Sequence, residues 1–157
     1  QTGNIDFTGT DKMTVWAGIT RLGGDTGVIV ELGDGYNTNS ILLYGSSDFY
    51  DFYSRGSFTS VATATNRPIA ITEVLAAASD VSNDVCLIRL DGNQESLLDA
   101  DQGAGGYRDA PLYIGARAGT SLYFNGRLYG LIVRGAQSSL SQIEATEAHI
   151  KQKMRLP

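Results

Sequence analysis

Short runs in which apolar and polar residues alternate are the dominant pattern of this chain. The clearest run covers residues 13–20, where every second residue is apolar. A period of two places alternate side chains on one face of an extended segment, so the run predicts a half-buried strand. Its apolar face consists of Met13, Val15, Ala17 and Ile19.

Further runs of strand character follow, each bounded by turn residues such as Gly, Asn and Asp. The run 50–55 places Tyr50, Phe52 and Ser54 on one face and Asp51, Tyr53 and Arg55 on the other. Because Gly23-Gly24-Asp25 separates the first two long runs, these are predicted to form a hairpin. The strands expected up to residue 90 cover 13–20, 28–32, 40–44, 50–55, 57–64, 69–75 and 85–90.

The last third of the chain changes character twice. Residues 95–109 are polar and rich in glycine, which predicts a long loop. Two more strand-like runs, 112–114 and 124–133, come before a helical pattern. Ser141-Gln142-Ile143-Glu144 has the form of a capping box and predicts where the helix begins. The helix has only a narrow apolar stripe, so we expect it on the outside of the fold.

These elements predict an all-β fold, an antiparallel two-sheet β-sandwich with one short C-terminal helix. The chain has 157 residues, 19 of them Gly, and 42% are hydrophobic while 18% are charged. This composition is that of a globular protein with many turns. No repeat or linker divides the sequence, so we expect a single domain over residues 1–157.

Charge and cysteine content exclude several classes of function. The formal net charge is -5 and the basic residues are scattered, which disfavours a nucleic-acid partner. No apolar run has the length of a membrane span, so membrane insertion is not expected. The one cysteine, Cys86, lies in an apolar run and is predicted to be a buried hydrophobic residue. The chain begins at Gln1, and we expect it to be a processed product or a domain of a larger protein.

Several short motifs occur in a characteristic order. The segment IRLDG (88–92) precedes PLYIG (111–115), and FNG (124–126) precedes a strand, a Leu-Ser pair and the helix. This order resembles laminin-G-like (concanavalin A-like) jelly-roll domains over nearly the whole chain. The resemblance implies a jelly roll of a kind that often binds glycans or proteins.

The segment FNGRLYGLIVRGA, with YIGAR before it, resembles the versions of this domain found at the C-terminal ends of phage or prophage tail proteins. That resemblance implies a place in a virion tail or on an extracellular surface. It also implies a glycan or polysaccharide of the bacterial surface as the partner. A homo-oligomer is expected in that setting, and a trimer if the domain ends a tail fibre.

Catalytic constellations are weakly represented. A glycosidase needs two carboxylates at a defined separation, and the E-x-D-x-E pattern of related glucanases is absent. His149, the one histidine, falls in the predicted helix, where a surface role is favoured over that of a general base. Zinc has too few Cys and His ligands. We therefore expect no enzymatic activity.

Calcium is the one metal that remains open, because it takes oxygen ligands. Asp34, Asn37 and Asn39 form one group of such ligands, and Asp99 with Asp101 another. Neither group has the spacing of a recognised calcium loop. Solvated turn residues are the favoured interpretation of both.

Sugar binding needs aromatic surfaces and planar polar groups close together, and three segments offer them. Each segment also has a simpler interpretation in which its tyrosines pack at sheet edges. Trp16 is a further aromatic candidate, although a tryptophan within a strand more often belongs to a core. The candidate ligand-binding residues are Asp34, Tyr36 and Asn37; Tyr50, Tyr53 and Arg55, with Asp51 between them; and Tyr107, Arg108 and Asp109.

The sequence therefore predicts a non-catalytic, lectin-like carbohydrate-binding domain. Two alternatives stay open. One is a structural or oligomerisation module of a tail fibre, in which the aromatic residues would be buried at subunit contacts. The other is a glycoside hydrolase with an unrecognised site.

Overall fold

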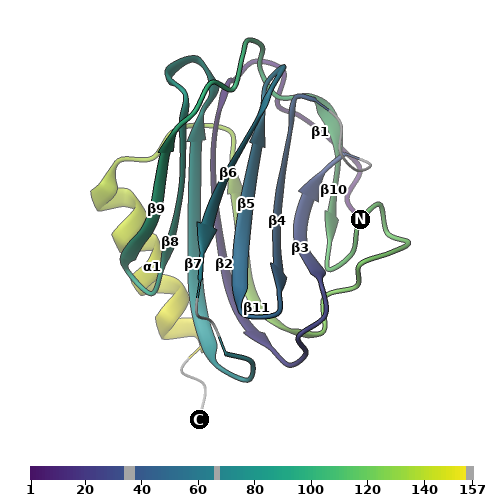
Figure 1. The fold of residues 1–157 in the computed structure, drawn as a ribbon, viewed down its shortest axis with the longest axis vertical. Helices are drawn as coiled ribbons and strands as arrows, with labels where there is room; N and C mark the ends of the chain where they lie inside the picture. Colours follow the sequence, from purple (N-terminus) through teal and green to yellow (C-terminus); the bar gives the residue numbers. More distant parts are fainter. Residues whose placement is uncertain (34–37, 66–67, 155–157) are drawn as a thin grey trace.

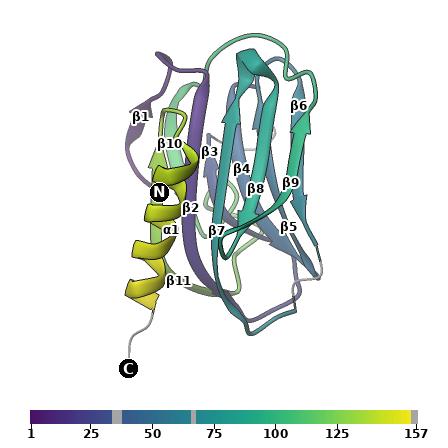
Figure 2. The ribbon, with the colours of Figure 1, turned by 90° about the vertical axis from the view of Figure 1, so that its left-hand side faces the viewer.

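The structure is a computed structural model that describes residues 1–33, 38–65 and 68–154. Two antiparallel sheets pack face to face, and one helix lies on the outside of the second sheet (Figures 1 and 2). The elements in chain order are β1 (Asn4–Asp6), β2 (Lys12–Arg21), β3 (Gly27–Leu32), β4 (Ser40–Ser46), β5 (Phe49–Arg55), β6 (Thr59–Ala64), β7 (Thr72–Asp80), the 3-10 helix η1 (Val81–Asn83), β8 (Val85–Leu90), β9 (Asn93–Asp99), β10 (Asp109–Ile114), β11 (Gly126–Arg134) and α1 (Leu140–Met154).

The order of strands mixes distant parts of the chain. The six-stranded sheet runs β1-β10-β3-β4-β5-β6, and the five-stranded sheet runs β11-β2-β7-β8-β9. The predicted antiparallel β-sandwich with a C-terminal helix is therefore confirmed. In the described part of the chain, no helix has the length and apolar character needed to cross a bilayer.

The main core lies between the two sheets and follows the predicted alternation. Met13, Val15, Ala17 and Ile19 of β2 all point into it and are fully buried. Cys86 also lies in this core, as predicted, and burial raises the pKa of its thiol to about 11.

A second apolar cluster lies under the helix. Trp16, on the other face of β2, packs with Ile143 and Ile150 of α1 and is 2% exposed. Both faces of β2 are therefore buried, and the prediction of a half-buried strand was wrong on this point. The alternation could not reveal it because α1 supplies the cover from the far end of the chain.

The predicted hairpin between the first two long strands is also wrong. β2 pairs with β7 and β11, whereas β3 pairs with β4 and β10. The glycine-rich connection between them carries the chain from one sheet to the other. A turn signal shows that the chain changes direction, but it does not show which sheet the next strand joins.

Part of the predicted loop 95–109 is a strand. β9 pairs with β8 at the edge of the five-stranded sheet, and most of its side chains are exposed. An edge strand open to water needs no apolar alternation, so its polar sequence concealed it. The connecting segment is thereby shortened to residues 100–108.

The helix begins two residues earlier than the predicted capping box. Gln142 N–H donates to Ser139 Oγ at 3.3 Å, and Ser139 N–H donates to Gln142 Oε1 at 3.0 Å. Ser139 and Gln142 thus form the reciprocal pair that was predicted for Ser141 and Glu144. His149 is exposed on α1, in keeping with its predicted surface role.

A close backbone approach at Gly56 supports a testable expectation. A Cβ atom at this position would lie 2.5 Å from Gln102 O and 2.6 Å from Val81 Cγ1. Gly56→Ala is expected to lower the free energy of unfolding by about 1–3 kcal/mol through overpacking. Urea titration measures this change in the free energy of unfolding. Gly24→Ala is the control, because nothing lies within 4 Å of a Cβ atom at that position. Equal stability of both variants would contradict this packing.

Candidate functional site

The outer face of the six-stranded sheet carries a connected group of polar and aromatic side chains. The two faces of β5 separate as the alternation predicts: Tyr50 and Phe52 turn into the core, which leaves Asp51, Tyr53 and Arg55 on the outer face. Tyr44 of β4 joins them, because it pairs with Asp51 in the strand register.

Asp51 is the centre of a hydrogen-bond network on this face. Tyr44 Oη donates to Asp51 Oδ2 at 2.8 Å, and Thr63 Oγ1 donates to Asp51 Oδ1 at 2.6 Å. Burial, together with the hydrogen bonds to Tyr53 and Asp51, raises the pKa of Tyr44 far above its ordinary value. The Tyr44 hydroxyl therefore keeps the proton that it donates to Asp51.

Tyr53 stands between two neighbours along the sheet. Its ring stacks on Tyr44 at a centroid distance of 5.7 Å, and the Arg55 guanidinium lies 5.0 Å from its centroid. Tyr44 is the strand partner of Asp51, and Asp51, Tyr53 and Arg55 are successive outward positions of β5, so Tyr44 and Arg55 lie on either side of Tyr53. The two ring faces are thus taken by protein groups, and Tyr53 offers a ligand its edge and hydroxyl.

Two residues of this predicted cluster are less accessible than expected. Tyr50 is fully buried, with the Arg21 guanidinium 5.0 Å from its ring centroid. Arg55 is 3% exposed. We therefore correct the prediction for Tyr50, which is a core residue, and place Arg55 as a support for the Tyr53 ring.

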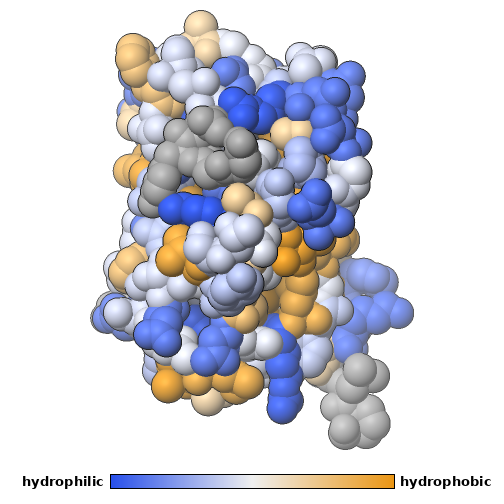
Figure 3. All heavy atoms as spheres, turned by 90° about the vertical axis from the view of Figure 1, so that its right-hand side faces the viewer, coloured by the Kyte–Doolittle hydropathy of each residue, from blue (hydrophilic) through white to orange (hydrophobic). Residues whose placement is uncertain are grey.

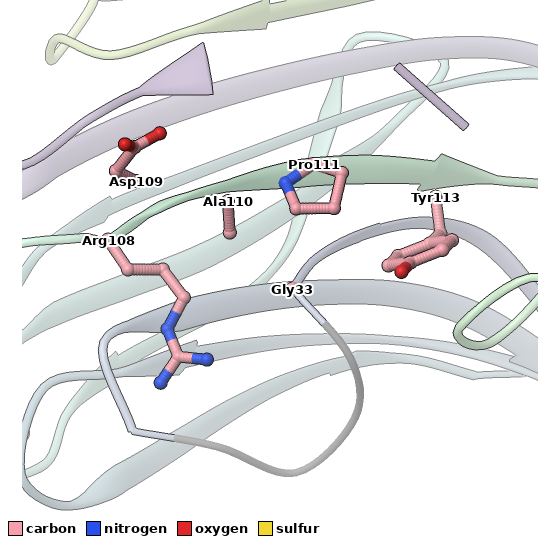
Figure 4. A pocket seen from close by; sticks show the side chains of 6 residues that line it. All are labelled: Gly33, Arg108, Asp109, Ala110, Pro111 and Tyr113. Atoms are coloured by element: carbon pink, nitrogen blue, oxygen red, sulfur yellow. The ribbon is translucent and has the colours of Figure 1, made fainter. Parts of the chain in front are cut away.

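An open pocket of about 450 Å³ lies at the other side of the same outer face. Figure 4 shows its lining: Arg108 reaches along it from one end and the Tyr113 ring lies at the other. Ala110 and Leu112 of β10 turn into the core, so the alternation directs Pro111 and Tyr113 outward. The lining residues are Gly33, Arg108, Asp109, Ala110, Pro111 and Tyr113.

Gly33 gives this pocket room for Arg108. Its φ is +87°, and a Cβ atom there would lie 3.3 Å from Cδ and Nη1 of Arg108. A side chain at this position would be both strained and crowded. The bare glycine backbone therefore lets the arginine lie flat against the end of β3.

A loop is fixed onto the sheet beside Tyr113. Glu31, the strand partner of Tyr113, is fully buried and accepts a hydrogen bond from Ala118 N–H at 3.2 Å. Arg117 Nε lies 3.6 Å from Glu31 Oε1. These contacts attach the segment that follows β10 to the outer face, which limits its movement next to the pocket.

The third predicted cluster is divided by the structure. Arg108 and Asp109 line the pocket, but Tyr107 is 2% exposed and lies in the core. Its hydroxyl is within hydrogen-bond distance of Ser54 Oγ at 2.9 Å and Ser79 Oγ at 2.6 Å. Burial raises the pKa of Tyr107 to about 12. The prediction for Tyr107 is thus corrected: it connects the two sheets from within.

The first predicted cluster, Asp34, Tyr36 and Asn37, lies outside the described residues. Tyr113 and Tyr44 are the site residues that sequence reasoning missed. The signal for Tyr113 was present in its alternation with Leu112, since a strand that buries Leu112 must turn Tyr113 outward.

Metal ligands are sparse. Among residues 1–33, 38–65 and 68–154, no group of three or more His, Cys, Asp or Glu side chains could hold a metal ion. Asp101 Oδ1 instead accepts a hydrogen bond from Gly103 N–H at 2.7 Å, which is typical of a turn. Asp34 and Asn37 of the other group lie outside the described part, so calcium there stays the less favoured alternative of the sequence analysis.

Comparison with known proteins adds a structural likeness. No family model and no curated protein matches the chain. The CBM40 of the Ruminococcus gnavus IT-sialidase bound to α2,3-sialyllactose is similar, with a TM-score of 0.71 and 16% identity over 88% of this chain and 83% of that one. The chain has a jelly-roll fold of the concanavalin A-like type.

Two further structures extend this likeness. A heptameric SAP-like pentraxin from Limulus polyphemus has a TM-score of 0.68 and 13% identity, over 88% of this chain and 70% of that one. Domains LG4-5 of the mouse laminin α1 chain have a TM-score of 0.65 and 15% identity, over 88% and 40%. At these identities the jelly-roll likeness concerns the fold, and function has to be argued from the site.

Proposed function

We propose that this jelly-roll domain is a non-catalytic carbohydrate-binding domain whose ligand lies in the pocket between Gly33, Arg108 and Tyr113. The observation that carries the proposal is the chemistry of this pocket. An aromatic ring, a guanidinium and a carboxylate, from Tyr113, Arg108 and Asp109, line one open hollow. Its volume of about 450 Å³ falls in the range of small-ligand sites.

The three side chains suit a sugar for separate reasons. The Tyr113 ring offers an apolar surface to the C–H groups of a pyranose. Arg108 presents donors in a planar fork, and the Asp109 carboxylate accepts from two hydroxyls. The Tyr44 and Tyr53 hydroxyls lie farther along the same outer face and would contact the next sugar units of a longer glycan.

The solved structures support the carbohydrate class. The similar Ruminococcus gnavus module is described as bound to sialyllactose, and it is a carbohydrate-binding module rather than a catalytic one. Other similar structures are whole sialidases, of which the matching part covers about a quarter. By analogy with the binding module, the proposed role of this domain is non-enzymatic.

We also propose the biological setting that the sequence resemblance implies. The domain would sit at the C-terminal end of a phage or prophage tail protein and bind a glycan of the bacterial surface. The proposed setting is supported by the sequence motifs at residues 113–117 and 124–136. A binding domain with its site on one sheet face is compatible with such a place.

The proposal predicts which substitutions weaken glycan binding. Tyr113→Ala and Arg108→Gln are each expected to weaken glycan binding about tenfold or more, since each removes a contact with no substitute in the pocket. A glycan array identifies the ligand, and calorimetry then compares the variants. Tyr123→Ala is the control, because Tyr123 is 65% exposed and lies outside the pocket lining.

Two outcomes would refute the proposal. A folded wild-type protein that binds no glycan on a broad array would exclude a lectin role. Turnover of a polysaccharide by the purified protein would overturn the non-enzymatic part.

One observation favours the structural alternative. β11 is an edge strand, and its Leu128 and Ile132 are each 40% exposed. Apolar groups also gather in the middle of the face shown in Figure 3. Sedimentation at several concentrations tests this alternative, and a concentration-dependent oligomer without glycan binding would favour it.

A further inference from the structure

A second hollow lies on the opposite side of the molecule, between α1 and the edge strand β11. Its volume is about 330 Å³, and it belongs to the outer face of the five-stranded sheet. Trp16, Ile132 and Ala145 give it an apolar lining. Arg134 and Gln142 add polar groups. This groove takes no part in the proposed carbohydrate site.

Arg134 is held in place on one side only. Its Nη1 donates to Ser138 Oγ at 2.9 Å and lies 3.4 Å from Gln142 Oε1. Both acceptors are neutral. In the described residues no carboxylate pairs with Arg134, and its Nε and Nη2 have no hydrogen-bond partner. That edge of a guanidinium is the one that binds a carboxylate through two parallel hydrogen bonds.

The acceptors that hold Arg134 are themselves ordered. Ser138 is buried, and its N–H donates to Thr14 Oγ1 at 3.2 Å. Gln142 Oε1 also accepts from Ser139 N–H at 3.0 Å. The arginine is thus positioned before any ligand arrives, which lowers the entropy cost of binding.

The charge around the groove favours an anion. None of the described residues that line it is acidic, although the whole chain has a formal net charge of -5. Glu144 and Glu147 of α1 are directed toward Arg89 instead. An uncompensated guanidinium beside an apolar lining fits a ligand with one negative group and a compact apolar or ring-shaped body.

We infer that the groove between α1 and β11 binds a compact organic carboxylate, with the carboxylate on Arg134 and the ligand body against Ile132 and Ala145. Free organic acids and acidic sugars share this chemistry. Trp16 lies beneath the groove, and its buried Nε1 has no hydrogen-bond partner in the described part of the chain. A ligand in the groove would alter the surroundings of this indole.

The one tryptophan of the chain makes the test specific. In ¹⁵N-labelled protein it gives a single indole N–H resonance, which is followed while benzoate or glucuronate is added. We expect a saturable shift with at least one of these acids. We expect the affinity to fall about tenfold or more in Arg134→Gln, and less in Arg134→Lys, which keeps the charge but loses the fork.

Controls separate the carboxylate from the rest of the ligand. Benzyl alcohol and glucose are the neutral counterparts, and Arg127→Gln changes an exposed arginine of the same strand. A response to glucuronate but not benzoate assigns the site to acidic sugars, and the reverse assigns it to free acids. Equal shifts with neutral counterparts, no shift with either acid, or unchanged affinity in Arg134→Gln would overturn the inference. Tyr113→Ala leaves this response intact, so failure here is distinct from failure of the carbohydrate site.

Discussion

Replacing Glu147 by alanine is expected to lower the free energy of unfolding by about 3–5 kcal/mol, because it removes the buried carboxylate that pairs with the buried Arg89 guanidinium. Arg89 Nε donates to Glu147 Oε1 at 3.0 Å, and Arg89 Nη2 donates to Glu147 Oε2 at 3.3 Å. Arg89 and Glu147 are 5% and 3% exposed. The pair joins β8 to α1, so its loss also loosens the helix from the sheet.

Glu144 provides a matched control for this variant. Its Oε1 lies 3.7 Å from Arg89 Nη2, but its side chain is 56% exposed. Glu144→Gln is expected to cost at most about 1 kcal/mol, as exposed pairs do. Urea denaturation followed by Trp16 fluorescence measures both, since Trp16 packs under the helix. Similar decreases in the free energy of unfolding in the two variants would show that the buried pair stabilises the fold no more than the exposed one.

Tyr107→Phe is expected to lower the free energy of unfolding by about 1–3 kcal/mol, because it leaves buried hydroxyls unsatisfied. The Tyr107 hydroxyl lies between Ser54 of β5 and Ser79 of β7, one from each sheet. Removing one oxygen atom thus breaks a polar connection between the two layers while the ring still fills its place in the core.

The control for Tyr107 is Tyr113→Phe, whose ring lines the open pocket. It is expected to leave the free energy of unfolding, measured by urea titration, unchanged within about 0.5 kcal/mol, as for most surface substitutions. Wild-type stability in Tyr107→Phe would contradict the bridging role. The comparison also shows that a loss of glycan binding in a Tyr107 variant would report a damaged core.

Much of the fold could be predicted because burial leaves a periodic trace. The alternation in 13–20 identified the side chains of β2 that reach the core, whereas that in 50–55 separated the two faces of β5 without showing which face is buried. Sheet membership could not be predicted, since both partners of β2 and one of the two partners of β3 come from distant parts of the chain. β9 was missed because an edge strand in water keeps no apolar period.

The site could be predicted only in part. Arg108 and Asp109 were recognised as polar residues near an aromatic one, and both line the pocket. Tyr107, in the same segment, was assigned to the site although its ring faces the core. In an extended segment, a shift of one position moves a side chain to the opposite face. The segment around Tyr107 has no regular alternation, so the sequence does not show which face its ring takes.

The interleaved order of the strands has a consequence for how the chain acquires its structure. Among the described strands β1 pairs with β10 alone, and β2 lies between β7 and β11, so each sheet needs segments from both ends of the chain. Closing such long loops is slow, because the chain loses conformational entropy before the contacts between the distant strands stabilise it. During synthesis β1 and β3 therefore lack β10 until residue 114 has left the ribosome, and β2 lacks β11 until residue 134 has done so. The sheets therefore close late, and until then the growing chain exposes unpaired strand edges that favour aggregation.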